Sequence, residues 1–318
     1  MRRTGTPLIL AGTGRSGTSW LLDVFSLLWQ YRPIFEPLHT QQVPEAREFV
    51  RLYLTEEDIH LSLKKLLEKV FWGKPENAWI RWMHMGITMN TPLPRKTLQY
   101  VYNLPKYRFW AKKRVVKLIN GNLLLEWLQK NFDVNIIFVI RHPCAVVASQ
   151  KKMGWAAGLE CFTRQEKLVN DYLAPFLPLL NSVKSLTENF MLRWCIENYV
   201  PLSQARKGRI KILPLFYEDM VMNPVEKLRE ILGNLQYPAP EIERFCNKFS
   251  KRQKPRRESL TKWQKNLSEK EISTILDYAK KFGLSFYGEG ELPDKTKLED
   301  FIGRDASASL QLLSPDKA

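Results

Sequence analysis

The most informative stretch of the sequence lies near its start and reads LILAGTGRSGTSW, from Leu8 to Trp20. Its first part, Leu8–Gly12, is a short apolar run typical of a buried strand. A glycine-rich segment, Gly12–Ser19, follows directly, and the apolar stretch from Trp20 to Trp29 has the character of a helix. Strand, glycine loop and helix in this order open the nucleotide-binding units of α/β folds. The stretch therefore predicts an α/β fold with a phosphate-binding turn.

The rest of the chain continues this alternation. Further strands are predicted at Arg32–Phe35, Val115–Leu118, Ile136–Ile140 and Ile210–Tyr217. Helix starts are predicted from capping patterns at Thr55 (for a helix to Val70), at Asn223-Pro-Val-Glu226, and at Ser268-Glu-Lys-Glu271 before Ile272–Phe282. Strands that alternate with capped helices predict a central, mainly parallel sheet flanked by helices.

The composition bounds the size of the domain and the nature of its ligand. The chain has 318 residues, of which 44% are hydrophobic, so one large α/β domain can form, although two small domains are also permitted. The net charge of +16 favours an anionic partner: nucleic acid, an anionic membrane, or a phosphorylated or sulfated small molecule. A basic surface that serves only solubility is the alternative.

Two sequence features point to the compartment. The first thirty residues contain no apolar run long enough for a membrane span and no secretory cleavage pattern. The four cysteines, Cys144, Cys161, Cys195 and Cys246, form no closely spaced pair, so we expect neither a zinc site nor a redox pair. We therefore expect a protein of the reducing cytoplasm.

The glycine loop differs from the mononucleotide loop G-x-x-x-x-G-K-[ST] at one position. Gly12 and Gly17 have the right separation, and Ser19 supplies the hydroxyl, but Thr18 stands where the lysine belongs and the cation is Arg15. Backbone N–H groups would still hold a phosphate, but the lysine that reaches a γ-phosphate is missing. An ordinary strand-to-helix turn remains the alternative for the glycines alone.

The loop Arg15-Ser-Gly-Thr-Ser-Trp20 resembles the [KR]-S-G-T-[ST]-[WL] loop of the sulfotransferases that use 3′-phosphoadenosine 5′-phosphosulfate (PAPS). The family's second signature is a buried strand that ends in Arg, with Ser eight residues later, and Ile136–Ser149 is similar to it. Leu215–Pro224 and Leu260-Thr-Lys-Trp263 resemble two later elements, the second of them found in the protein-tyrosine branch.

The resemblance implies a single P-loop-like domain over about residues 1–290, followed by a polar tail at 291–318. It implies that the loop holds the 5′-phosphosulfate and that Arg141 and Ser149 hold the 3′-phosphate, which agrees with an Arg fork at a strand end beside a helix hydroxyl. The cofactor-binding residues that it implies are Arg15, Ser16, Gly17, Thr18, Ser19, Trp20, Arg141, Ser149, Tyr217 and Lys262.

Sulfuryl transfer needs a base, cations at the leaving phosphate and in-line placement. We expect Arg15 and Lys117 to supply the charge without a metal; Lys117 lies within an apolar strand pattern, where a lone charge would be costly, unless it faces solvent at a sheet edge. The expected base is Glu36, which resembles the aromatic-Glu-Pro element of the carbohydrate branch, with His39 as the second candidate. A solvated turn carboxylate is the alternative role of Glu36.

The acceptor is a hydroxyl compound that the sequence does not name. An insert at about 71–114 interleaves aromatic and basic residues, which suits a sugar, an anionic group or a peripheral membrane contact, or else reflects core aromatics and solvated cations. Met153 stands where the protein-tyrosine branch has an arginine, with Lys151 and Lys152 as substitutes, so we expect a carbohydrate, a glycolipid or another small molecule rather than protein tyrosine. The sequence leaves the oligomeric state open.

Two other functions remain as alternatives. A phosphotransferase of the nucleotide-loop class would bind ATP and depend on magnesium, but it leaves Thr18 unexplained. A nucleic-acid-binding protein would account for the charge but not for the two phosphate signatures, so we do not expect nucleic acid as a partner. A bacterial-type cytoplasmic sulfotransferase is the interpretation that explains all of these features together.

Overall fold

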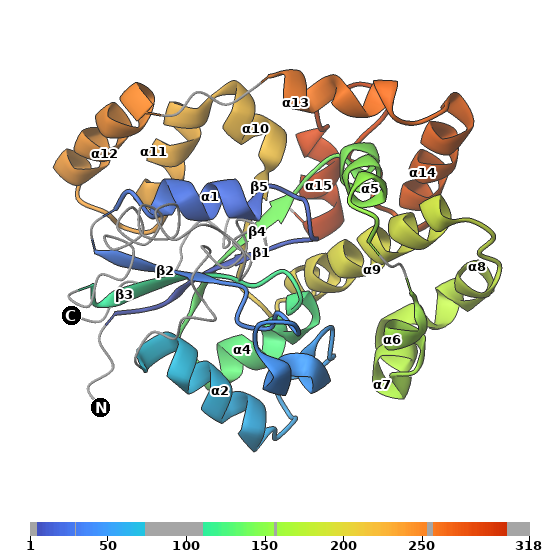
Figure 1. The fold of residues 1–318 in the computed structure, drawn as a ribbon, viewed down its shortest axis with the longest axis horizontal. Coiled ribbons are helices and arrows are strands. Elements are labelled where there is room, and N and C mark those ends of the chain that lie inside the picture. The colour runs from blue at the N-terminus through green and yellow to red at the C-terminus, as the bar shows by residue number, and fades with distance from the viewer. Residues whose placement is uncertain (1–4, 29, 74–110, 156–157, 253–256, 304–318) are drawn as a thin grey trace, which may run out of the picture.

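The computed structural model describes residues 5–28, 30–73, 111–155, 158–252 and 257–303. Its centre is a sheet of five strands in the order β2-β3-β1-β4-β5, and all its pairings are parallel (Figure 1). The strands are β1 (Leu8–Ala11), β2 (Tyr31–Phe35), β3 (Lys113–Lys117), β4 (Asn135–Ile140) and β5 (Leu213–Phe216). The predicted α/β fold with a flanked parallel sheet is confirmed.

Helices cover both faces of the sheet (Figure 1). One face is packed by α1 (Thr18–Phe25), α10 (Tyr217–Met222), α11 (Pro224–Asn234) and α12 (Ala239–Arg252). The other is packed by α2 (Leu61–Trp72), α4 (Leu125–Asn131), α5 (Pro143–Lys152), α9 (Leu186–Arg206) and α14 (Glu269–Lys281). Shorter elements complete the chain: η1 (Pro44–Phe49), η4 (Asn122–Leu124), α6 (Glu160–Thr163), α7 (Glu166–Leu168), η5 (Val169–Leu173), η6 (Ala174–Phe176), α8 (Leu177–Asn181), α13 (Glu258–Thr261), η7 (Lys262–Lys265) and α15 (Lys295–Ile302).

The two cores follow from the alternation of side chains along each strand. In β1, Leu8 and Leu10 join the apolar cluster under α1 and α11, whereas Ile9 and Ala11 join the cluster on the opposite face. Both clusters are apolar because a parallel sheet covered by helices is buried on both faces. The carboxyl ends of all five strands consequently meet at one edge, where parallel α/β sheets bind ligands.

The predicted start of the second helix is wrong by several residues. Thr55 does not cap a helix: its N–H and Oγ1 both donate to Asp58 Oδ2, at 2.7 and 3.0 Å, and close a turn. Helix α2 begins at Leu61 instead, with His60 as its N-cap. An Asx-type turn competes locally with the helix start, which explains the shift.

The other predicted helix starts agree with the structure. Helix α11 begins at Pro224, as expected, although the side chain of Asn223 makes no cap hydrogen bond within the described residues. Helix α14 begins after Ser268, and the capping box between Ser268 and Glu271 is complete. Helix α1 covers Thr18–Phe25 and thus begins two residues before the predicted apolar stretch.

Two predicted segments are described only in part. Of the insert at 71–114, residues 74–110 lie outside the described residues, and its last basic residues, Lys113 and Arg114, belong to β3. In the segment expected as a polar tail, residues 295–302 form α15, which packs on α9 through the buried Leu298 and Ile302. Residues 304–318 lie outside the described part. Among the helices that the structure describes, none combines the length and apolar character that crossing a membrane requires.

Candidate active site

The glycine loop leaves β1 in a conformation that needs glycine at two positions. Gly12 has φ of 142°, and a Cβ atom there would come within 2.4 Å of the carbonyl oxygen of Val139 on β4. Gly17 has φ of 102° and lies against the ring of Tyr217, where a Cβ atom would come within 2.3 Å of Cδ2. Glycine is thus required at both positions by close approach as well as by backbone geometry.

The N-terminus of α1 is arranged to receive an anion. Its N-cap residue is Gly17, which has no side chain that could cap the first N–H groups of the helix. The first N–H groups of a helix lack intrahelical acceptors and carry partial positive charge. Ser16, which is 1% exposed, has a buried Oγ without a hydrogen-bond partner among the residues that the structure describes. A phosphate oxygen at this point would satisfy both the helix N-terminus and the serine hydroxyl.

Four polar side chains, each from a different part of the fold, hold four consecutive loop residues in place. The bonds are Gly12 N–H to Asn122 Oδ1 (3.0 Å), Asn198 Nδ2 to Thr13 Oγ1 (3.0 Å), Gln150 Nε2 to Gly14 O (2.8 Å) and Arg141 Nη1 to Arg15 O (3.0 Å). Asn122, Gln150 and Asn198 are at most 2% exposed. Sequence reasoning missed these three residues, since nothing in their local pattern indicates which distant backbone group they contact.

The second phosphate signature lies directly beside the first. Arg141 follows the end of β4, and its guanidinium carbon is 4.3 Å from the centroid of the Tyr217 ring. Its Nη1 donates to Arg15 O at 3.0 Å, while its Nε is buried without a partner among the described residues. On α5, Ser149 Oγ accepts a hydrogen bond from Arg15 Nε at 2.9 Å. Arg15, Arg141, Ser149 and Tyr217, predicted from separate motifs, therefore form one cluster.

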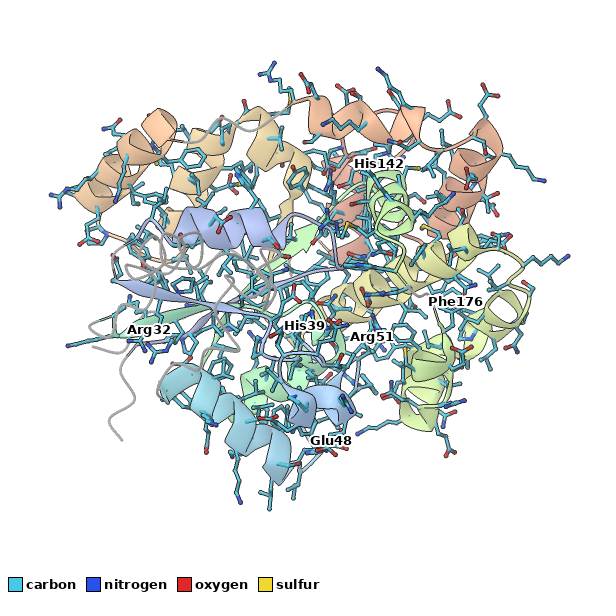
Figure 2. All side chains as sticks on the ribbon, viewed as in Figure 1. Arg32, His39, Glu48, Arg51, His142 and Phe176 are labelled. Atoms are coloured by element: carbon cyan, nitrogen blue, oxygen red, sulfur yellow. The ribbon has the colours of Figure 1, made fainter. Side chains whose placement is uncertain are left out.

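A buried network behind Arg141 fixes the end of β4. Glu218 accepts hydrogen bonds from the backbone N–H of His142 (3.0 Å) and from Tyr287 Oη (2.7 Å), and burial raises the pKa of its carboxyl. The ring of His142, which Figure 2 labels, stacks on Trp263 with the ring centroids 4.5 Å apart, and burial lowers the pKa of His142 to about 4. The Tyr-Glu and Lys-Trp elements of the sequence thus support Arg141 through Glu218 and Trp263.

Glu36 and Lys117 meet at the carboxyl ends of adjacent strands. The β2–β3 register pairs Phe35 with Lys117, so Glu36 follows directly beyond that pair. Lys117 Nζ forms a close ion pair with Glu36 Oε1, and the side chains are only 6% and 9% exposed. The lysine also lies over the Phe35 ring, 4.2 Å from its centroid. The prediction that this charge is buried, rather than at an exposed edge, is therefore confirmed.

The backbone at Glu36 is unusual for a non-glycine residue. It has φ of 43°, in the left-handed region, and its N–H donates to Lys117 O at 3.1 Å. Its C=O accepts from the N–H of His39 at 2.9 Å, and this turn brings His39 Nε2 to 3.9 Å from Glu36 Oε2. Such strained conformations persist where the surrounding structure enforces them, often at functional sites. Both candidate bases thus lie together.

Arg15 connects the base to the phosphate cluster. Its own φ is 80°, and its side chain reaches the surface. Burial of the remainder of the guanidinium lowers the pKa of Arg15, the nearby Arg141 lowers it further, and Glu36 acts in the opposite direction. Arg15 therefore lies within electrostatic range of both Arg141 and Glu36 and remains a cation at neutral pH.

The remaining predicted residues take lesser or different places. Trp20 lies on α1 with its ring edge-on to Tyr217 (6.3 Å), while Thr18 and Ser19 occupy the first turn of that helix. Lys262 begins η7 with an exposed side chain. In the Lys251–Arg257 run, residues 253–256 lie outside the described part.

The two lysines expected as substitutes for the arginine that Met153 replaces lie in different surroundings. Lys151 forms an ion pair with Glu271 on α14, and this contact, first among several, lowers the pKa of Glu271 to about 2. Met153 and Lys152 are both exposed. Of the two lysines, Lys151 is therefore already paired with a carboxylate.

Comparison with known proteins identifies the family. The profile of the sulfotransferase domain matches residues 5–281, so the chain belongs to the sulfotransferase family and is a sulfotransferase enzyme. It is also similar to the crystal structure of sulfotransferase STF9 from Mycobacterium avium, with 16% identity and a TM-score of 0.46, over 91% of this chain and 79% of that chain. No curated protein matches the chain. Within its described residues there is no group of three or more His, Cys, Asp or Glu that could hold a metal ion.

Proposed function

We propose that the enzyme transfers the sulfuryl group from PAPS to a hydroxyl of a carbohydrate, a glycolipid or a similar small molecule. The observation that carries this proposal is the direct contact between the two phosphate signatures. Arg141 donates to Arg15 O and Arg15 donates to Ser149 Oγ, across 126 and 134 residues of sequence. Two adjacent cationic sites suit a nucleotide with phosphates at both its 3′ and 5′ positions.

The 5′-phosphosulfate would lie against the glycine loop. Among the described residues, no side chain caps the N-terminus of α1 and Ser16 Oγ has no hydrogen-bond partner. Both observations support an anion at this point. Arg15 and Lys117 would stabilise the charge that develops on the leaving phosphate. The 3′-phosphate would lie against Arg141 and Ser149, where the buried Arg141 Nε still has a proton to donate.

Glu36 would act as the general base. The acceptor hydroxyl attacks sulfur, the bond between sulfur and the bridging phosphate oxygen breaks, and the hydroxyl proton passes to a Glu36 oxygen. The Lys117 ammonium group lies against this carboxylate and holds it at the strand end. As charge develops on the leaving phosphate, Lys117 can stabilise that oxygen instead, so the pair would serve both ends of the reaction.

The acceptor class rests on resemblance more than on contacts. Phe35-Glu36-Pro37 is similar to an element of the carbohydrate branch, and Met153 replaces the arginine of the protein-tyrosine branch.

The four cysteines are all unpaired, which supports a reducing compartment and hence the cytoplasm.

Calorimetric titration tests the donor. We expect adenosine 3′,5′-bisphosphate to bind more tightly than AMP and than ATP with Mg²⁺. Arg141→Gln should lower the affinity for the bisphosphate by about 10- to 100-fold. The control Arg244→Gln removes an exposed arginine from α12 and should change nothing. Preference for ATP with Mg²⁺ would instead favour the phosphotransferase alternative.

A further inference from the structure

A second charged cluster lies near the loop and has no part in the functions assigned above. Glu197 on α9 is 1% exposed, and its Oε1 accepts from both Arg51 Nε (3.1 Å) and Arg193 Nε (2.9 Å). Its Oε2 has no partner among the described residues. In the part of the chain that the structure describes, no second carboxylate pairs with either arginine. The cluster therefore carries a net charge of one positive unit in a partly buried place.

This cluster adjoins the loop on the side of Gly14. Arg193 lies 5.8 Å from the centroid of the Trp155 ring. A Cβ atom on Gly14 would come within 2.8 Å of that ring and 3.6 Å of Ile119 Cδ1, so both side chains border the loop there. The next residue of α9 after Glu197 is the one that holds Thr13. The positive charge of the cluster is thus separated from the loop by one layer of side chains.

Hydrogen bonds through Asn120 connect the backbone of Arg51 to the segment that carries the candidate bases. Its backbone N–H donates to Asn120 O at 2.8 Å, and Asn120 Nδ2 donates to Leu38 O at 3.4 Å; His39 is the next residue after Leu38. Arg51 has φ of 55°, a disfavoured conformation for this residue type, and Gln165 Nε2 holds its carbonyl at 2.9 Å. A strained residue that is bound on both sides indicates a side chain whose position matters.

Exposure decides which arginine a ligand could reach. The Arg51 side chain is 21% exposed, whereas that of Arg193 is 5% exposed. Arg51 uses Nε toward Glu197, its guanidinium also contacts the Cys161 side chain, and its Cζ lies 5.9 Å from the centroid of the Phe162 ring. Part of its donor edge is left for a ligand. An anion here would balance the excess charge, and the partial burial would strengthen the contact.

We propose that Arg51 binds a carboxylate of the acceptor, so that the enzyme sulfates a hydroxyl compound that also carries a carboxylate. This proposal rests on the proposed function, because only the Trp155 ring separates Arg193 of this cluster from Gly14 of the loop. Glu197 and Arg193 act as positioning residues: Glu197 holds the Arg51 guanidinium through Nε, and Arg193 holds the same carboxylate oxygen in place. The shared carboxylate prevents the two arginines from repelling each other.

Matched pairs of probes test this proposal. The pairs are methyl glucuronide with its amide, and 4-hydroxyphenylacetate with its amide, each measured by ligand-observed NMR with and without saturating adenosine 3′,5′-bisphosphate. We expect the acid of at least one pair to bind about 10- to 100-fold more tightly than its amide. Arg51→Gln should bring that ratio near one without weakening the amide, whereas Arg51→Lys should retain part of the preference.

The control is Arg47→Gln, which removes an exposed positive charge from the same segment and should leave the ratio unchanged. Equal binding of acid and amide by the unsubstituted enzyme, no binding of either acid, or an unchanged ratio in Arg51→Gln would each overturn the proposal. Binding of the bisphosphate is recorded in the same samples. Its loss would count against the proposed donor, and that result is separate from the ratio of acid to amide.

Discussion

The ion pair between Glu36 and Lys117 predicts strong coupling between the two residues in the free energy of unfolding. Both side chains are less than 10% exposed, so removal of one leaves the other charge buried. Breaking such a pair costs about 3–5 kcal/mol. When Glu36 is removed, the contact of Lys117 with the Phe35 ring offsets about 0.5–2 kcal/mol of this loss in the free energy of unfolding. We therefore expect Glu36→Gln and Lys117→Met each to lower the free energy of unfolding by about 3 kcal/mol.

The double substitution should be far milder than the sum of the two. With both charges gone, no buried ion lacks a partner, so the loss should stay near that of one single variant, and the coupling should be about 3 kcal/mol. Urea unfolding of the four proteins, followed by circular dichroism, measures these free energies. A double variant whose loss equals the sum of the single losses within about 0.5 kcal/mol would refute the buried pair.

Three further predictions follow from the site and its surroundings. Ser149→Ala and Arg141→Ala should weaken adenosine 3′,5′-bisphosphate far more than AMP in calorimetry, by about 1.5–3 kcal/mol each, and an equal loss for both nucleotides would mean that the 3′-phosphate site is misassigned. Transfer should persist in excess EDTA in a radiolabel assay, whereas loss with rescue by Mg²⁺ would indicate a metal. The pKa of Glu271 is lowered to about 2, so its pair with Lys151 stabilises the fold above the ordinary carboxyl range and this stability is lost as pH falls toward 2. Glu271→Gln should therefore reduce the acid sensitivity of unfolding between about pH 5 and 2 by about 1–2 kcal/mol, and an unchanged pH profile would contradict the pair.

Strands β1 and β4 were predictable from the sequence because they consist almost entirely of apolar residues. Leu8–Ala11 and Asn135–Ile140 are buried on both faces, and such strands contain almost no polar residues. Glu36 and Lys117 were singled out separately, one by resemblance and one because a charge in an apolar strand is costly. The parallel pairing of β2 with β3 is what joins them, and no local pattern contains that pairing.

The residues that hold the loop were not predictable, because their partners are distant in the sequence. Asn122, Gln150 and Asn198 contact the loop across 110, 136 and 185 residues. The local sequence around a buried Asn or Gln does not show whether its side chain holds a distant loop or packs within the core. The shifted start of α2 has a local cause: Thr55 and Asp58 satisfy each other in a turn, so the helix begins later.

Turnover of Glu36→Gln tests most directly whether Glu36 removes the acceptor proton while the loop binds the donor. Transfer of radiolabelled sulfuryl from PAPS is measured with an accepted hydroxyl compound, and titration with adenosine 3′,5′-bisphosphate shows that the variant is folded and binds. We predict that kcat falls by about 10²–10⁴-fold while the affinity for the bisphosphate stays nearly unchanged, and that His39→Asn is mild. Near-normal turnover of Glu36→Gln, together with a large loss of turnover in His39→Asn, would contradict the role of Glu36 as the general base and assign that role to His39.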